Sequence, residues 1–142
     1  MLKVWDTSAL LSVLLHQTAT KQLRALLSAD GGMALWWGSK VEAVSALCRL
    51  RRAGEISEAS ASRLLANVDA LASAAYEIQP TEEVRGAACR MLRVHELRAA
   101  DAFQLAAALV WADHHPAGAG FVCVDRRLRD AAEREGFDIL PA

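Results

Sequence analysis

Short apolar segments alternate along the chain with longer segments that have helical spacing, and this alternation constrains the fold more than any other feature. The five predicted strands cover residues 4–5, 33–37, 76–79, 121–124 and 137–140. At least one predicted helix lies between each strand and the next. Because parallel strands need crossover connections, which are usually helices, the pattern predicts an α/β fold: a three-layer α/β/α sandwich around a central, mostly parallel sheet.

The predicted helices account for most of the remaining chain. They cover residues 9–15, 18–28, 39–52 and 99–112, and further helices are expected around residues 64–72, after residue 80 and between the last two strands. The chain has 142 residues, which is a usual length for one domain. We therefore predict a single domain over residues 1–142.

Composition limits the class of protein. Hydrophobic residues make up 54% and charged residues 23%, a balance typical of a folded domain. The net charge of −1 provides no overall positive field, so contacts with a polyanion must come from local patches. The three cysteines lie far apart without a CxxC pair, which is typical of reduced residues in a cytoplasmic protein. No apolar run reaches about eighteen residues, so no membrane-spanning segment is expected.

Four acidic residues lie where the predicted topology gathers side chains. Asp6 and Asp125 directly follow predicted strands, and the carboxyl ends of parallel strands form the edge at which ligands bind. Glu42 lies one turn into the helix after the second strand, and Asp101 lies in the first turn of an apolar helix. Each residue also has a local explanation that needs no metal. Asp6 and Asp125 could cap the helices that follow them, Ser39 to Glu42 fits a capping box, and Asp101 could interact favourably with the dipole of its own helix.

Convergence of the four carboxylates predicts a metal site. Clustered anions repel one another and oppose folding unless a cation neutralises them. Since all of the ligands are oxygens, Mg²⁺ or Mn²⁺ is favoured over zinc or copper. Such ions activate water and stabilise charge on a phosphate, so the expected reaction is phosphodiester hydrolysis. Thr7 and Ser8 either orient a ligand or water there or cap the helix that follows.

Four segments together resemble the PIN-domain ribonucleases, and in particular the VapC-type toxins of bacterial toxin-antitoxin pairs. The resemblance covers essentially the whole chain and depends on the order and spacing of the segments. They are Val4-Trp5-Asp6-Thr7-Ser8-Ala9-Leu10, Val41-Glu42-Ala43, Ala100-Asp101-Ala102 and Val122-Cys123-Val124-Asp125.

The resemblance implies a PIN-like fold and Mg²⁺- or Mn²⁺-dependent endonuclease activity on RNA. It also implies a homodimer that is inhibited by a cognate antitoxin protein. Asp6, Glu42, Asp101 and Asp125 match the acidic positions of the family and are the predicted catalytic and metal-binding residues. Several arginines could contact phosphates, and Arg49, seven residues beyond Glu42 on roughly the same helix face, is the first of them to test.

Two other functions remain as alternatives. The first is a PIN-like scaffold that binds a partner without catalysis. The second is a phospho-receiver domain, which would need an acidic pair after the first strand and an aspartate after the third. The first strand ends in the single Asp6, and the third runs into Pro80 without an aspartate, so the receiver domain ranks lowest. The Gly118-Ala119-Gly120 segment is no dinucleotide loop, because it lacks the third glycine and precedes a strand.

Overall fold

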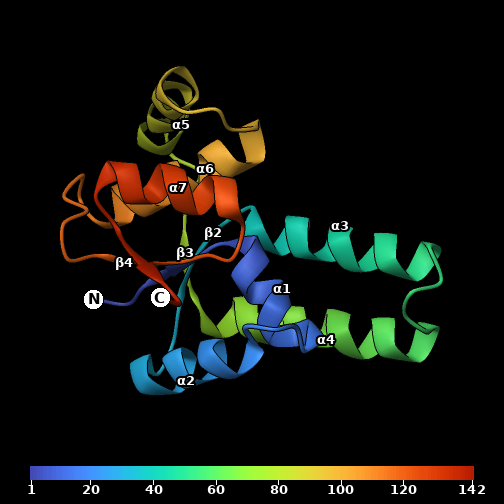
Figure 1. Ribbon diagram of the computed structural model, residues 1–142. Coiled ribbons are helices and arrows are strands. Elements are labelled where there is room, and N and C mark those ends of the chain that lie inside the picture. The colour runs from blue at the N-terminus through green and yellow to red at the C-terminus, as the bar shows by residue number, and fades with distance from the viewer.

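The computed structural model describes residues 1–142 and has a five-stranded sheet at its centre (Figure 1). All four pairs of neighbouring strands are parallel, and the order across the sheet is β3-β2-β1-β4-β5. The predicted α/β fold is thus confirmed, with a sheet that is entirely parallel. The strands are β1 (Val4–Trp5), β2 (Ala34–Trp36), β3 (Tyr76–Ile78), β4 (Gly120–Val122) and β5 (Asp138–Leu140).

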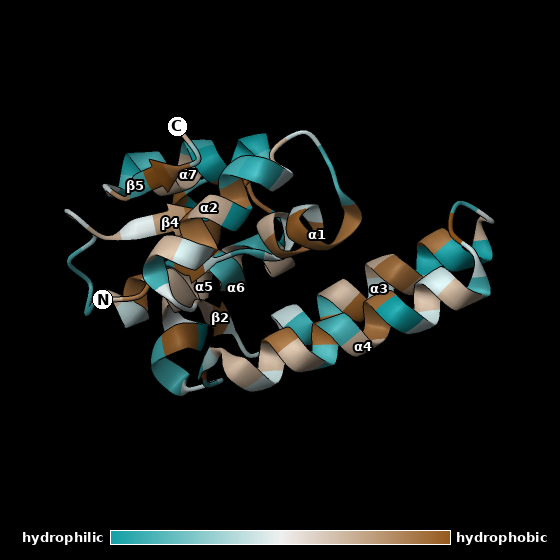
Figure 2. Cartoon of the chain, turned by 90° about the horizontal axis from the view of Figure 1, so that it is seen from below, coloured by the Kyte–Doolittle hydropathy of each residue, from teal (hydrophilic) through white to brown (hydrophobic).

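Seven helices cover the two faces of the sheet. Figure 1 shows α5, α6 and α7 on one side and α1 to α4 on the other. The helices are α1 (Thr7–Leu15), α2 (Thr20–Asp30), α3 (Ser39–Arg52), α4 (Glu58–Ala74), α5 (Glu82–Val94), α6 (Ala99–Trp111) and α7 (Arg126–Glu135). Helices α3 and α4 pair along their length and extend away from the rest of the molecule (Figure 2). No helix is long and apolar enough to cross a membrane.

Alternate residues of each central strand supply two separate hydrophobic cores. Val4 packs with α5, α6 and α7, whereas its neighbour Trp5 packs with α1, α2, α3 and α4. Successive side chains of a strand point to opposite faces, so a sheet covered on both faces needs apolar residues at consecutive positions. Both side chains are almost fully buried. This explains why the central strands appear in the sequence as short apolar runs.

The structure corrects several predicted boundaries near the carboxyl edge of the sheet. Helix α1 begins at Thr7 because Asp6 caps it, two residues before the predicted start. Strand β4 ends at Val122 and not at residue 124, although the N–H of Cys123 still donates to the carbonyl of Leu140. Asp125 therefore lies three residues beyond its strand, as the N-cap of α7.

The strand order also bears on the alternatives. A receiver domain has the flavodoxin-like order 2-1-3-4-5, in which β1 lies between β2 and β3. Here β1 lies between β2 and β4. The receiver alternative is thus wrong. The chain goes from β1 to β2 on one side of it, whereas β4 lies on its other side, so the strand order reverses between β1 and β4. In open α/β sheets, ligands bind at the carboxyl ends of the strands at such a reversal.

Candidate functional site

Asp6 lies at this reversal point, directly after β1. Its backbone N–H donates to the carbonyl of Val122 at 3.0 Å, which holds it in line with the sheet. Its carboxylate accepts a hydrogen bond from the N–H of Ala9 at 3.0 Å and from the hydroxyl of Ser8, which lies 2.8 Å from both oxygens. Only 3% of Asp6 is exposed. Burial raises the pKa of this carboxyl to about 6, although these hydrogen bonds act in the opposite direction.

Ser8 joins Asp6 to the segment that carries Asp125. Its Oγ accepts hydrogen bonds from the N–H groups of Val124 at 3.1 Å and Asp125 at 3.2 Å while it donates to Asp6. The Asp125 carboxylate accepts from the N–H of Leu128 at 3.1 Å and is otherwise exposed. The capping role considered for Asp125 and for Asp6 is therefore confirmed.

Glu42 is held by two neutral donors from other helices. The Thr7 hydroxyl donates to Oε1 at 3.1 Å, and the side-chain amide of Gln104 lies 3.1 Å from Oε2. Burial raises the pKa of Glu42, the two hydrogen bonds lower it, and the charge of Asp101 raises it further. The predicted capping box is wrong, because Gly38 is the N-cap of α3 and Ser39 already lies inside the helix.

Asp101 links the other carboxylates electrostatically. Burial is the main reason that its pKa is raised, and the charge of Asp125 raises it further. The positive charges of Arg98 and Arg127 lower it. Glu42 thus interacts with Asp101, and Asp101 with Asp125. Repulsion among the carboxylates is what the sequence predicted for this edge.

The carboxylates of Asp6, Glu42 and Asp101 are suitable ligands for a hard divalent cation, but their present spacing suits one ion only in part. Carboxylate oxygens with raised pKa values gain from a nearby cation, and oxygen ligands suit Mg²⁺ or Mn²⁺. No three acidic, histidine or cysteine side chains lie close enough together to hold one ion in their present conformations. Binding one ion through three of these carboxylates therefore requires side chains to rotate.

Gln104 is the residue of this site that the sequence analysis did not single out. It lies on α6 with 1% exposure, and its Nε2 is 2.8 Å from Thr7 Oγ1 and 2.9 Å from Ser39 Oγ, besides its contact with Glu42. A signal was present in the sequence. Gln104 interrupts an otherwise apolar helix three residues after Asp101, and residues three apart share a helix face.

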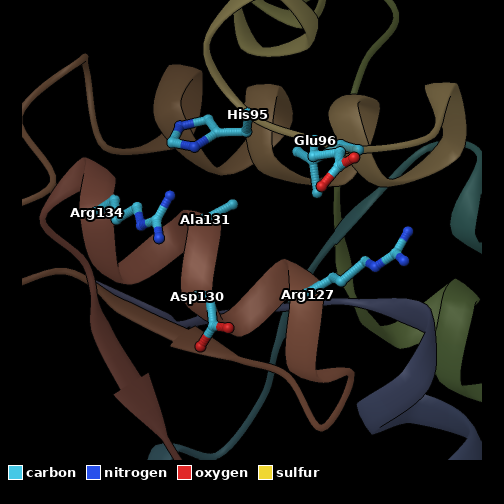
Figure 3. A pocket seen from close by; sticks show the side chains of 7 residues that line it. His95, Glu96, Arg127, Asp130, Ala131 and Arg134 are labelled. Atoms are coloured by element: carbon cyan, nitrogen blue, oxygen red, sulfur yellow. The ribbon is translucent and has the colours of Figure 1, made fainter.

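A small cavity of about 150 Å³ has none of these four carboxylates in its lining. It opens between α7 and the segment that joins α5 to α6. Figure 3 shows His95 and Arg134 at one end of it, with Glu96 and Arg127 at the other. The same Arg127 lowers the pKa of Asp101, whereas Arg49 is exposed on α3. Arg127 thus joins the cavity to the acidic edge.

A solved structure of another protein has the same overall fold as this chain. The strand order and helix layers define a three-layer α/β/α sandwich with an all-parallel sheet. Among solved structures, the chain is similar to the crystal structure of FitAcB from Neisseria gonorrhoeae, with a TM-score of 0.62 and 14% sequence identity. The match covers 97% of this chain and 96% of that chain, so the two share the fold from end to end. No family model and no curated protein sequence matches the chain.

Proposed function

We propose that this protein is a Mg²⁺- or Mn²⁺-dependent endoribonuclease that hydrolyses RNA phosphodiester bonds, and that it is the VapC-type toxin of a toxin-antitoxin pair. Asp6, Glu42 and Asp101 would hold the metal, with Asp125 at the outer side of the site. When bound, the ion supplies an activated water and neutralises charge that develops on the phosphate. The resemblance of four acidic segments to the PIN-domain ribonucleases and the PIN-like fold support this proposal.

The observation that carries the proposal is the burial of Asp6. Its pKa of about 6 means that the ionised carboxylate at neutral pH destabilises the folded protein. A helix cap alone does not require this charge, since asparagine or serine caps a helix about as well. A buried carboxylate with a raised pKa, at the edge of the sheet that carries the other carboxylates, is typical of a functional site.

Arginines beside the carboxylates supply the positive charge that the composition lacks overall. Arg98 and Arg127 lie near enough to Asp101 to lower its pKa. Guanidinium groups bind phosphate oxygens through paired hydrogen bonds. We infer that these two arginines, in preference to Arg49, contact the RNA backbone next to the bond that is cut.

RNA cleavage by the purified protein tests the proposed activity. We expect cleavage with Mn²⁺ or Mg²⁺, none with EDTA, and a loss of about 100-fold for Asp101→Asn, because a metal contributes several kcal/mol and each 1.4 kcal/mol is a factor of ten. Circular dichroism should show that the variant is folded. Equal cleavage by the variant, or with EDTA, would point to a contaminating nuclease.

A PIN-like scaffold that binds a partner without catalysis is the second candidate. The spacing of the carboxylates favours it, because no three of these groups are close enough to hold one ion as they lie. Isothermal titration with Mn²⁺ and with Mg²⁺, together with the cleavage assay, separates the two functions. Neither metal binding nor cleavage of any RNA would support the scaffold.

We further propose that the protein forms a homodimer and binds a cognate antitoxin. Several large apolar side chains are exposed, including Trp37 (51%), Val41 (68%) and Val94 (60%). Trp37 and Val41 lie four residues apart around the start of α3, and exposed apolar residues that form a patch mark interfaces between proteins. Light scattering is expected to give twice the chain mass of 15.3 kDa, and Val41→Lys to reduce it to that of the monomer. A monomeric wild-type protein would contradict the homodimer.

A further inference from the structure

The Glu42 carboxylate is fixed from two sides by groups that belong to other elements. Thr7 of α1 donates to one oxygen and Gln104 of α6 to the other. The chemistry of the amide group determines which atom donates in the hydrogen bonds among Gln104, Thr7 and Glu42. Because the amide of Gln104 can only donate through Nε2, Thr7 Oγ1 accepts from it at 2.8 Å and its own proton is directed to Glu42.

Packing alone does not account for a glutamine at this place. Gln104 is fully buried, and its Oε1 has no hydrogen-bond partner. A buried polar atom without a partner costs about 1–3 kcal/mol of stability. Leucine or methionine would fill a similar volume without this cost, and the neighbouring helix positions are apolar. The residue therefore costs stability in return for the contacts that the two N–H protons of Nε2 share among Thr7, Ser39 and Glu42.

The neutrality of the amide matters for a cation site. An arginine or lysine at this position would also hold Glu42, but its charge would cancel that of the carboxylate and repel a divalent cation. An amide orients the carboxylate by hydrogen bonding and leaves its negative charge in place. The same amide contacts Ser39, the first residue of α3, and so ties the helix of Glu42 to α6, which carries Asp101.

We propose that Gln104 is a positioning residue that holds the Glu42 carboxylate, directly and through Thr7, in one orientation for binding a divalent cation. This role rests on the proposed function, in which Glu42 is a metal ligand. Gln104 itself is no ligand in it, because its Nε2 faces Glu42, Thr7 and Ser39 as a donor. Groups that orient metal ligands in this way typically change metal affinity by about 10- to 100-fold when removed.

The test is Mn²⁺ affinity, measured by isothermal titration without RNA. Gln104→Met removes the amide but keeps the length of the side chain, and Leu105→Met, at an equally buried position of α6, is the matched control. We expect about 10- to 100-fold weaker Mn²⁺ binding for Gln104→Met and wild-type affinity for the control. If Gln104→Met does not fold, Gln104→Leu replaces it.

A double-mutant cycle separates positioning from a general structural role. If Gln104 acts through Glu42, then Gln104→Met causes no further loss of Mn²⁺ affinity in a Glu42→Gln background. Equal losses in both backgrounds, or wild-type affinity of the single variant, would overturn the inference.

The crystal structure of Gln104→Met tests the role without metal. We expect the Glu42 carboxylate to leave its place beside Thr7, and an unchanged Glu42 would overturn the inference whatever the metal measurements give. By contrast, a wild-type protein that binds neither Mn²⁺ nor Mg²⁺ while Glu42 moves in this variant would contradict the proposed function and the purpose of the positioning, but not the positioning of Glu42 by Gln104.

Discussion

An Asp6→Asn variant is expected to lose RNA cleavage by about 1,000-fold and to be more stable than the wild-type protein at neutral pH without metal. The loss follows because Asp6 is the most buried of the proposed metal ligands and cannot be replaced by solvent. The gain follows from its raised pKa. A shift from 3.8 to about 6 corresponds to about 3 kcal/mol at most, and asparagine keeps the capping acceptor for the N–H of Ala9.

The sign of the pH dependence follows from the same shift. Below pH 3.8 the Asp6 carboxyl is protonated in both the folded and the unfolded chain, so its ionisation costs no stability. Between about pH 4 and 6 the unfolded chain ionises more readily, and the free energy of unfolding falls as the pH rises. Above about pH 6 the whole loss is present. The advantage of Asp6→Asn over wild type should therefore grow from pH 4 to pH 6 and then stay constant.

Urea denaturation in EDTA at pH 4, 5, 6 and 7.5 measures this difference. The other site carboxylates are present in both proteins, so their contributions largely cancel in the comparison. Asp138→Asn, at an exposed position of β5, is the control and should match wild type at every pH. A variant no more stable than wild type at pH 7.5 would show that the buried charge carries no cost. Saturating Mn²⁺ is expected to stabilise wild type and to have little effect on Asp6→Asn.

Ser8→Ala is expected to be the most destabilising single change at the site, with a loss of about 2–4 kcal/mol. The Ser8 hydroxyl accepts from the N–H groups of Val124 and Asp125, and its removal leaves these donors without their partner. It also donates to both oxygens of Asp6, so the charge of Asp6 loses a stabilising hydrogen bond. The N–H of Val124 is partly buried, and an unmet buried donor costs about 1–3 kcal/mol, whereas the N–H of Asp125 is exposed and can bond to water instead.

The same change should weaken catalysis by about 10- to 100-fold, because it releases the orientation of Asp6 relative to the segment of Asp125. Ser45→Ala, on the exposed side of α3, is the matched control and should change stability by less than about 0.5 kcal/mol. Chemical denaturation gives the stability, and the cleavage assay is done on the fraction that remains folded. If Ser8→Ala resembles Ser45→Ala in both measurements, Ser8 does not join the two segments in solution.

Two local features of the sequence carried most of the correct predictions. The alternation of short apolar runs with helical segments predicted the layered fold, because a strand that is buried on both faces needs consecutive apolar residues. Acidic residues that follow strands, such as Asp6, predicted a shared edge of the sheet, where Ser8 joins Asp6 to the segment of Asp125. These features depend on neighbours within a few residues, so they can be read without the tertiary structure. Whether the four acidic residues bind metal remains a prediction.

The contacts that complete the site were decided only by the tertiary structure. The amide of Gln104 meets the hydroxyl of Thr7 across 97 positions of the chain, and that of Ser39 across 65. Periodicity shows which side of a helix is apolar, but not which strand or helix it packs against. How the helices fill both faces of the sheet determines the strand order. That order includes the reversal between β1 and β4, which brings Asp6 beside the segment of Asp125.

The boundaries that were predicted wrongly have the same physical origin. Residues Cys123 and Val124 are apolar enough to continue β4, yet the strand ends at Val122. The N–H of Cys123 makes one more hydrogen bond to Leu140 of β5, and the N–H of Val124 donates instead to the hydroxyl of Ser8. That hydroxyl belongs to a helix more than a hundred residues away in the sequence. The sequence by itself therefore determined the layers and the acidic edge, while packing between distant segments decided which polar groups surround each carboxylate.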